Sequence, residues 1–471
     1  MQYIDKIYIN GAFVAPHGTE LFPLHNPATA EVIGQVQLGN EQDARLAIAA
    51  AKAAFPAWSA TRKAGRIAVL QRMQDAVKER EEALFDAIVT EYGAPRSRAR
   101  WMAQYPADVI GQAIAALADF PFTGRAGSAD VVMTPVGVVG LITPWNSDAG
   151  FICNKLATAM AAGCTAVIKP SEMSAIQTRI VTEALHEAQV PAGVFNIVTG
   201  RGDVVGEVIN QHPDIAKISF TGSTAVGKHI IARGADTLKR VTLELGGKSP
   251  TIILDDADTD WAISRALAAG FMNSGQACIA GTRILIPASR QAALEQAIVQ
   301  AVGQIQSGDP EDPATDIGPM VSQKQWQRVQ DYIQLGIDEG ARLLTGGPGR
   351  PTGMSRGWCV RPTVFAGNNQ MRIAREEIFG PVLVVIPYQN EADAIAIAND
   401  TIYGLSALVL SGDTARGIAV ARQIDAGRVL VNTLAHEPLA PFGGVKQSGL
   451  GREMGKWGLQ AYLEPKTLLV G

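Results

Sequence analysis

The chain has 471 residues, of which 47% are apolar and 18% charged, and its formal net charge is −4 at pH 7. At roughly 150 residues per domain, this length predicts about three structural units with substantial apolar cores. The slightly acidic balance offers no basic surface for a polyanion, so nucleic acid is not expected among the partners.

The four cysteines are scattered without a Cys-x-x-Cys pair, and the six histidines do not stand at metal-ligand spacing beside them. A metal site is therefore not predicted. Residues 1–10 alternate apolar and polar side chains as a strand does, and they lack the apolar centre of a signal peptide. The richest apolar stretch, Val131 to Trp145, is short and interrupted by two prolines. We expect no membrane span and a soluble, cytoplasmic protein.

Residues 40 to about 118 have apolar side chains at helical spacing, among them Ile67, Leu70, Met73 and Val77. Such helices are expected to cover one face of a sheet.

From residue 136 onward, short β-branched runs alternate with helical runs. Strands are expected at 136–142, 166–169, 195–198, 217–220 and 241–245, with helices such as 174–188 and 224–234 between them. This alternation predicts a parallel sheet with helices on both faces, and ligands bind beyond the carboxyl ends of such strands. Four polar groups stand at these ends: Trp145-Asn146, Lys169-Pro-Ser-Glu172, Thr221-Gly-Ser223 and Glu244.

The glycine turn at 222–229 comes close to a Walker A loop. His229 stands where Ser or Thr must hold Mg²⁺, and no Gly-x-Gly-x-x-Gly follows a strand, so neither common nucleotide fingerprint is complete. A glycine turn that opens a helix still offers free backbone N–H groups to a phosphate. An ordinary strand-to-helix turn explains the same residues equally well.

Cys278 ends the octapeptide Phe271-Met-Asn-Ser-Gly-Gln-Ala-Cys278, just past an apolar run with helical spacing. A thiol becomes a nucleophile only near a helix N-terminus, a cation or a base. By itself, the peptide is more typical of an inert core cysteine.

A second alternating series begins after Cys278. Strands are expected at 283–286, 360–364, 382–386, 407–410 and 428–432, with helices such as 291–306 and 322–340 between them. The series predicts a second α/β domain, and the lack of a fixed repeat excludes a solenoid. Residues 128–134 and 461–470 are expected as edge strands outside either sheet.

Further blocks are Thr143-Pro-Trp-Asn146, Phe220-Thr-Gly-Ser-Thr224, Val241-Thr-Leu-Glu-Leu-Gly-Gly-Lys-Ser-Pro250, Glu376-Glu-Ile-Phe-Gly-Pro381 and Pro441-Phe-Gly-Gly-Val-Lys-Gln-Ser-Gly449. Together with Lys169-Pro-Ser-Glu172 and the octapeptide, they resemble the NAD(P)-dependent aldehyde dehydrogenase superfamily, in its order and from end to end.

The resemblance implies an aldehyde dehydrogenase-like α/β fold. Its parts would be a Rossmann-type parallel-sheet NAD-binding domain (1–117 and 136–246), a second α/β catalytic domain (247–447) and a small β oligomerisation arm (118–135 and 461–471). Residues 448–460 would pack back on the core. The arm would pair with a neighbouring subunit in a homodimer or homotetramer.

The resemblance also implies the catalytic residues. Cys278 would be the nucleophile, Asn146 an oxyanion donor, Glu244 the base that activates water, and Lys155 a residue of lesser role in proton relay. Without it, Asn146 fits a turn, and Glu244 fits an ion pair with Lys239 or Arg240.

The cofactor implied is NAD, with NADP possible but less favoured. Lys169 and Glu172 would bind the adenine ribose hydroxyls, and the carboxylate of Glu172 would oppose a 2′-phosphate; in isolation the two residues fit a solvated surface pair. The cofactor positions carried over are Thr143, Trp145, Lys169, Ser171, Glu172, Thr221, Gly222, Ser223, Gly227, Leu245, Glu377 and Phe379.

The substrate pocket is where the chain departs from many family members. Ser147, Gly150, Phe151 and Asn154 recur at i, i+3, i+4 and i+7, so they share one helical face. We expect this face to line an aldehyde tunnel with Ala277, Ile279 and His436. The small residues predict a wide tunnel; alternatively, they make room for a larger side chain from elsewhere.

The expected activity is NAD-dependent oxidation of an aldehyde to the carboxylic acid through a thiohemiacetal and a thioester, which a glutamate-activated water hydrolyses. The expected substrate is bulky or polar-substituted, such as an aromatic, heterocyclic or semialdehyde compound. The alternatives are a CoA- or phosphate-dependent acylating dehydrogenase and a non-catalytic structural member of the fold.

Overall fold

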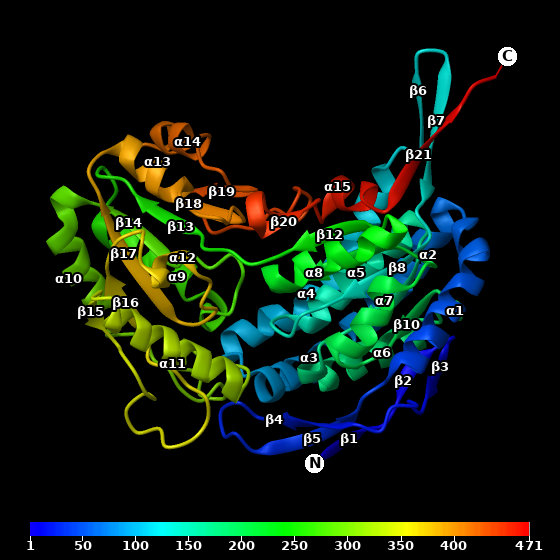
Figure 1. Ribbon diagram of the computed structural model, residues 1–471, viewed down its shortest axis with the longest axis horizontal. Helices are drawn as coiled ribbons and strands as arrows, with labels where there is room; N and C mark the ends of the chain where they lie inside the picture. The colour runs from blue at the N-terminus through cyan, green and yellow to red at the C-terminus, as the bar shows by residue number, and fades with distance from the viewer. Residues whose placement is uncertain (471) are drawn as a thin grey trace.

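The computed structural model describes residues 1–470, which form two lobes and a projecting arm (Figure 1). The first lobe contains an eight-stranded sheet in the order β20-β12-β11-β8-β9-β10-β2-β3. Its parallel centre consists of β8 (Val138–Ile142), β9 (Thr165–Lys169), β10 (Phe195–Ile197), β11 (Ile215–Thr221) and β12 (Arg240–Glu244). These five strands confirm the alternating pattern predicted from the sequence.

The edges of this sheet are antiparallel, unlike the all-parallel sheet that the sequence predicts. They are formed by β2 (Ile7–Ile9), β3 (Ala12–Val14) and β20 (Gly449–Leu450). β2 lies within residues 1–10, which have the expected strand pattern, whereas β3 and β20 were not predicted. The N-terminal segment also divides, because β1 (Gln2–Ile4) joins a separate sheet with β4 (Leu21–His25) and β5 (Val32–Gln37).

Helices cover both faces of the eight-stranded sheet because its strands alternate their buried side chains between two cores. Val139, Leu141 and Ile168 pack against α2 (Lys63–Lys78), α4 (Arg96–Asp119), α5 (Asp148–Ala162) and α6 (Ala175–Glu187). Val138 and Val167 face α1 (Glu41–Ser59), α7 (Glu207–Gln211) and α8 (Thr224–Gly234). The helical prediction for 40–118 is confirmed, with α3 (Glu81–Ala87) and a π-helical turn at Ile88–Tyr92 completing it.

The second lobe is built on a seven-stranded sheet in the order β15-β16-β17-β14-β13-β18-β19, in which only β15 runs antiparallel. The strands are β13 (Pro250–Ile253), β14 (Arg283–Pro287), β15 (Arg342–Thr345), β16 (Thr363–Ala366), β17 (Val382–Tyr388), β18 (Ser406–Leu410) and β19 (Arg428–Val431). Its helices are α9 (Thr259–Gly270), α10 (Gln291–Val302), α11 (Gln323–Asp338), α12 (Arg372–Arg375), α13 (Glu391–Asn399) and α14 (Thr414–Ala421).

Two strands of this sheet, β13 and β15, were not predicted from the sequence. The strand expected at 360–364 instead begins at Thr363, since Pro362 has no N–H to donate to a ladder. The other four predicted strands of this series are confirmed within a few residues.

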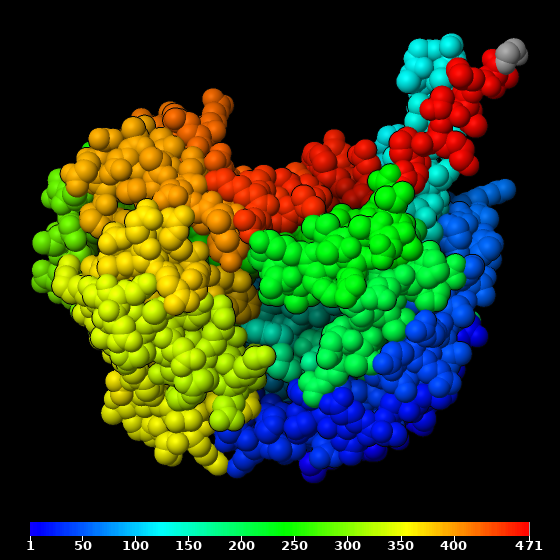
Figure 2. All heavy atoms as spheres, in the orientation of Figure 1, coloured from blue at the N-terminus to red at the C-terminus, as the bar shows by residue number. Residues whose placement is uncertain are grey.

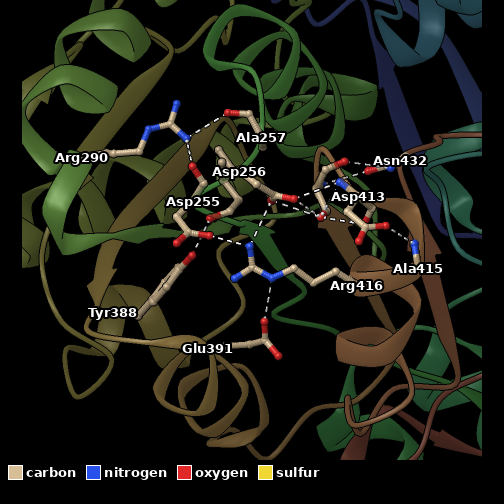
Figure 3. A network of polar contacts seen from close by, with 12 residues as sticks. Asp255, Asp256, Ala257, Arg290, Tyr388, Glu391, Asp413, Ala415, Arg416 and Asn432 are labelled. Atoms are coloured by element: carbon tan, nitrogen blue, oxygen red, sulfur yellow. Dashed lines mark hydrogen bonds and ion pairs between the residues drawn. The ribbon is translucent and has the colours of Figure 1, made fainter.

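A polar network closes the carboxyl ends of these strands (Figure 3). Arg416 donates to Asp255 after β13 (2.6 Å) and to Glu391 at the start of α13 (2.9 Å), while the hydroxyl of Ser411, after β18, donates to Asp256 (2.9 Å). Tyr388 at the end of β17 donates to the Ile253 carbonyl (2.9 Å). The polar groups at this edge satisfy one another's hydrogen bonds and hold the ends of these strands together.

The arm is a three-stranded antiparallel sheet of β6 (Thr123–Ala126), β7 (Ala129–Pro135) and β21 (Leu463–Leu468), and it projects from the first lobe (Figures 1 and 2). The strands expected at 128–134 and 461–470 are confirmed as β7 and β21, whereas β6 was not predicted. Before β21, α15 (Gly455–Gln460) packs against α4 and α5.

Within residues 1–470, no helix is long and apolar enough to cross a membrane, and no group of three or more His, Cys, Asp or Glu side chains is placed to hold a metal ion. All four cysteines are free thiols.

Candidate active site

The two sheets meet end to end. Strand β12 ends at Glu244 and β13 begins at Pro250, so the carboxyl edge of the first sheet faces the amino edge of the second. The surface is hollowed between the lobes (Figure 2). A cavity of about 300 Å³ lies between the facing ends of the two sheets, lined among others by Asn146, Glu244 and Cys278. Three residues from distant parts of the chain thus converge as the sequence predicts.

Cys278 lies in the loop after α9. Three residues of this loop have a left-handed backbone conformation, which reverses the direction of the chain. Asn273 has φ 54°, Ser274 φ 58° and Gly275 φ 75°, a conformation that costs free energy for the two residues with a Cβ. The side chain of Gln276 anchors the loop, accepting from the Val321 amide (3.0 Å) and donating to the Pro319 carbonyl (3.3 Å). The loop holds the thiol at the cavity instead of in a core.

Gly246 and Gly247, which follow Glu244, let the Glu377 carboxylate and the Cys278 backbone approach the chain closely. A Cβ at Gly247 would lie 2.4 Å from the carbonyl oxygen of Cys278, and one at Gly246 would lie 2.5 Å from a carboxylate oxygen of Glu377. The Gly247 amide also donates to Glu377 (3.1 Å). Any side chain at these positions would displace the nucleophile loop or Glu377.

The surroundings of Cys278 disfavour its thiolate. Burial and the nearby carboxylates of Glu377 and Glu244 raise the pKa of the Cys278 thiol to about 12. The backbone N–H groups of Cys278 and Ile279 act in the opposite direction and lower it. A nucleophilic role therefore needs additional positive charge or a base near the sulfur.

The Asn146 amide is oriented for donation into the cavity. Its Nδ2 donates one hydrogen to the Gln276 carbonyl (3.0 Å), and the side chain is buried at the cavity wall. An amide nitrogen has two hydrogens, so the second remains available to a ligand oxygen beside Cys278.

Glu244 is only 3% exposed, and neither of its carboxylate oxygens has a hydrogen-bond partner within residues 1–470. Burial, reinforced by Glu453, raises the pKa of Glu244 well above its usual value. The alternative of an ordinary ion pair is wrong: Arg240 pairs with Glu464, and Lys239 donates to backbone carbonyls. An unpaired buried carboxyl with a raised pKa is typical of a general base.

Lys155 lies behind Glu244 in a buried network that sequence reasoning missed. Its ammonium pairs with Glu453 and donates to Ser219 Oγ (2.9 Å), while Asn154 Nδ2 donates to the other Glu453 oxygen (3.4 Å). Glu453 also lines the cavity. The only sequence signal for it is an acid four residues after Gly449, which by itself says nothing of the contact.

The expected cofactor residues lie along the carboxyl edge of the first sheet. At the end of β9, Lys169 Nζ lies 3.3 Å from Glu172, and Arg201, which the sequence did not single out, lies 3.6 Å from the same carboxylate. A Cβ at Gly206 would meet only Lys169 Cδ, at 4.0 Å, so there is open space beside the Cα of this glycine.

Several of these residues also form hydrogen bonds within the protein itself. Ser223 caps α8, and Ser171 accepts from the Met173 amide (3.3 Å). Thr143 donates to Asp148 (3.0 Å), whereas the buried hydroxyl of Thr221 has no partner in the described chain.

The glycines of the α8 turn serve packing. A Cβ at Gly227 would lie 2.6 Å from Leu245, and one at Gly222 would lie 2.4 Å from the ring of Phe220. Phe379, with φ 63°, meets Trp145 edge-on with ring centroids 5.4 Å apart. These two rings frame the cleft beside Glu377.

Six of the seven expected pocket residues line the cavity: Ser147, Phe151, Asn154, Ala277, Ile279 and His436. Gly150 does not. A Cβ there would lie 2.6 Å from the ring of Tyr105, so this glycine makes room for a larger side chain from α4, the alternative reading of the sequence. The lining residues that sequence reasoning missed are Arg98, Trp101, Tyr105, Met272, Asn273, Arg428, Leu434, Phe442, Glu453 and Met454.

A comparison with known proteins identifies the family. The profile described as "Aldehyde dehydrogenase family" matches residues 13–468. The chain belongs to the aldehyde dehydrogenase family. It is 44% identical to a Pseudomonas 3-succinoylsemialdehyde-pyridine dehydrogenase, over 100% of this chain and 99% of that protein.

Solved structures agree with this identification. A mutant of aldehyde dehydrogenase C from Pseudomonas syringae, in complex with NAD⁺ and octanal, has a TM-score of 0.97 at 44% identity, covering 99% of this chain and 96% of that one. A Mycobacterium tuberculosis aldehyde dehydrogenase complexed with NAD⁺ has a TM-score of 0.97 at 40% identity, covering 100% and 99%. The family, the fold and the assignment as an aldehyde dehydrogenase are confirmed.

Proposed function

We propose that this aldehyde dehydrogenase uses NAD⁺ to oxidise a bulky or polar-substituted aldehyde to its carboxylic acid, through a thiohemiacetal and a thioester on Cys278. The observation that carries the proposal is the convergence of Cys278, Asn146 and Glu244 on one cavity. Two structural neighbours bound to NAD⁺ support the choice of cofactor.

The residues at the sheet edge fit NAD. Lys169 and Glu172 offer a donor and an acceptor to a ribose diol beside the open space at Gly206, and the N-terminus of α8 offers backbone N–H groups to a phosphate. When bound, NAD⁺ supplies the acceptor for the hydride that leaves the substrate carbon. Glu377 and Phe379 are proposed to hold its nicotinamide ribose and ring.

The acylation half of the reaction needs a thiolate and an oxyanion site. The sulfur of Cys278 bonds to the aldehyde carbon, and the carbonyl oxygen becomes an alkoxide. The free hydrogen of Asn146 Nδ2 and the Cys278 backbone N–H would donate to that oxygen. Such donors each contribute about 3 kcal/mol in acyl-transfer sites.

The deacylation half needs a base. The Glu244 carboxylate accepts a proton from water, whose oxygen bonds to the thioester carbon; the carbon–sulfur bond then breaks and returns the Cys278 thiolate. Glu453 raises the pKa of Glu244 and Lys155 lowers it, so their buried network is proposed to adjust the strength of this base. Because a coenzyme-A-acylating enzyme has no need of this base, Glu244 favours hydrolysis.

The walls of the cavity support a large substrate. Aromatic rings from three parts of the chain line it, namely Trp101, Tyr105, Phe151 and Phe442. The name of the Pseudomonas relative describes a pyridine-bearing semialdehyde, and octanal is bound in one structural neighbour. We propose an aromatic, heterocyclic or semialdehyde substrate over acetaldehyde.

The test is NADH formation with an aldehyde panel, run with and without CoA or phosphate. We expect turnover without either addition and a higher kcat/KM for aromatic aldehydes or semialdehydes than for acetaldehyde or propanal. Cys278→Ala should abolish oxidation while NAD⁺ binding stays nearly intact. Turnover that requires CoA or phosphate would favour the acylating alternative, and residual activity within a few-fold of wild type in Cys278→Ala would refute the nucleophile.

A further inference from the structure

Two arginines in the substrate cavity have no counter-ion. Arg98 belongs to α4 and Arg428 begins β19, and both line the cavity that contains Cys278. The Nε of each is buried without a hydrogen-bond partner, and within residues 1–470 neither guanidinium forms an ion pair. An arginine stays protonated and has five N–H donors, so an unpaired one facing a cavity is costly unless a ligand or water satisfies it.

The fold satisfies guanidinium groups elsewhere. Arg283 is fully buried, and its donors reach Asn369 (2.9 Å) and three backbone carbonyls. Unlike Arg283, Arg98 and Arg428 line the cavity with a buried Nε that has no hydrogen-bond partner.

The guanidinium of Arg98 stacks on the aromatic ring of Trp101. The guanidinium carbon lies 4.1 Å from the centroid of Trp101, which stacks on Tyr105 at 4.7 Å. Stacking occupies the face of the guanidinium and leaves the N–H groups at its edge free to donate in the plane. This arrangement is suited to the two oxygens of a carboxylate.

The acids of the cavity do not neutralise these arginines. Within residues 1–470, Glu453 pairs with Lys155 and Glu244 has no hydrogen-bond partner, so neither carboxylate pairs with either guanidinium group. Met272 lines an adjoining groove with Arg98 and a second small cavity with Arg428. Two like charges in one cavity repel each other, and a bound anion would relieve that repulsion.

We propose that the aldehyde carries a carboxylate at the end remote from the reacting carbon, that Arg98 binds this carboxylate, and that Arg428 adds positive charge to the same cavity. This inference rests on the proposed function and narrows its substrate class to aldehyde acids with an aromatic or short aliphatic body.

The experiment compares two aldehydes of one shape, 4-carboxybenzaldehyde and the neutral 4-carbamoylbenzaldehyde. Wild type should prefer the acid in kcat/KM. Arg98→Met should lower kcat/KM for the acid by about ten-fold or more, the effect of losing a charge-assisted hydrogen bond, mainly through KM. The value for the amide should change by less than about three-fold, because a neutral group gains little from the charge. Arg98→Lys should restore part of the preference.

Arg265→Met is the matched control. Arg265 also stacks on a tryptophan, with its guanidinium carbon 4.6 Å from the Trp261 centroid, but it does not line the cavity. This variant should leave both aldehydes unaffected. A wild type without preference for the acid, or an equal loss for both aldehydes in Arg98→Met, would overturn the inference.

A binding measurement separates this inference from the proposed function. If neither aldehyde is oxidised by folded wild-type protein, the proposed function fails. Calorimetric binding of 4-carboxybenzaldehyde and of 4-carbamoylbenzaldehyde to Cys278→Ala then still tests Arg98. Tighter binding of the acid that is lost when Arg98→Met is added supports the anion site, and equal binding of the two compounds refutes it.

Discussion

Cys278 and Glu244 share surroundings that disfavour negative charge. Burial raises the pKa of both groups, and each carboxylate near the thiol raises it further. A glutamate with a raised pKa binds a proton more readily than an exposed one, which is what a base near neutral pH requires. The same surroundings favour the protonated thiol, so Cys278 needs a nearby positive charge or a base to form the thiolate.

We predict that Glu244→Gln retains the first burst of NADH better than steady-state turnover, because deacylation needs the base more than acylation does. In wild type, kcat should fall as the pH drops through the raised pKa of Glu244, since the protonated carboxyl cannot accept a proton from water. Rapid-mixing kinetics across pH measure both effects. Equal losses of burst and turnover would mean that Glu244 also activates the thiol.

A second prediction at this scale concerns Glu172. Glu172→Gln should weaken NAD⁺ binding and narrow the gap to NADP⁺, because the charge that opposes a 2′-phosphate is removed while Lys169 and Arg201 remain close by. The measurement is kcat/KM with each cofactor. An unchanged preference would exclude the proposed role of this carboxylate.

At the scale of secondary-structure elements, the position of the nucleophile loop depends on how β14 is fixed to its neighbours. Arg283, the first residue of β14, is fully buried and donates to Lys248 (2.9 Å), Asn369 (2.9 Å) and the end of α13. Cys278 lies five positions before Arg283 in the segment that leads directly into β14, so this anchor also fixes the loop.

We predict that Arg283→Met destabilises the protein by about 3 kcal/mol, because it leaves several buried acceptors without a donor. Scanning calorimetry at one fixed rate should show a clearly lower Tm. The control is Arg356→Met, which breaks an exposed ion pair with Glu31 and should change Tm little. A Tm for Arg283→Met equal to that of the control would contradict the anchoring role.

At the scale of the whole molecule, the arm exposes surface that one chain does not cover. β6 is exposed along its whole length, and the end of β21 exposes Leu468 at 44%. A thin sheet with exposed apolar side chains is typical of an intersubunit contact. We therefore maintain the expectation of a homodimer or homotetramer as a proposal.

Leu468→Asp should shift the protein toward a smaller assembly, because a charge would be buried at the proposed contact. Light scattering after size-exclusion chromatography measures the mass. Leu238→Asp, at another exposed leucine that lies outside the arm, should have no effect. A monomeric wild type would rule out the proposal.

The amino-acid sequence by itself determined the alternating strands and the positions of Asn146, Lys169, Thr221 and Glu244. These features are local: each polar group directly follows an apolar strand, and adjacent parallel strands end at one edge. The family blocks were equally visible, because they are short contiguous peptides. β13 was not predicted, and the strand expected at 360–364 begins only after Pro362, as β16.

Only the tertiary structure decided which side chains meet. Lys155 and Glu453 form an ion pair although 298 residues separate them, and Gly150 faces Tyr105 instead of the tunnel. The unpaired state of Arg98 and Arg428 is also a property of the assembled cavity, since it depends on every element packed around them. Spacing along the chain predicts faces and ends of elements, but contacts between distant segments arise from how the elements pack, and local sequence does not encode them.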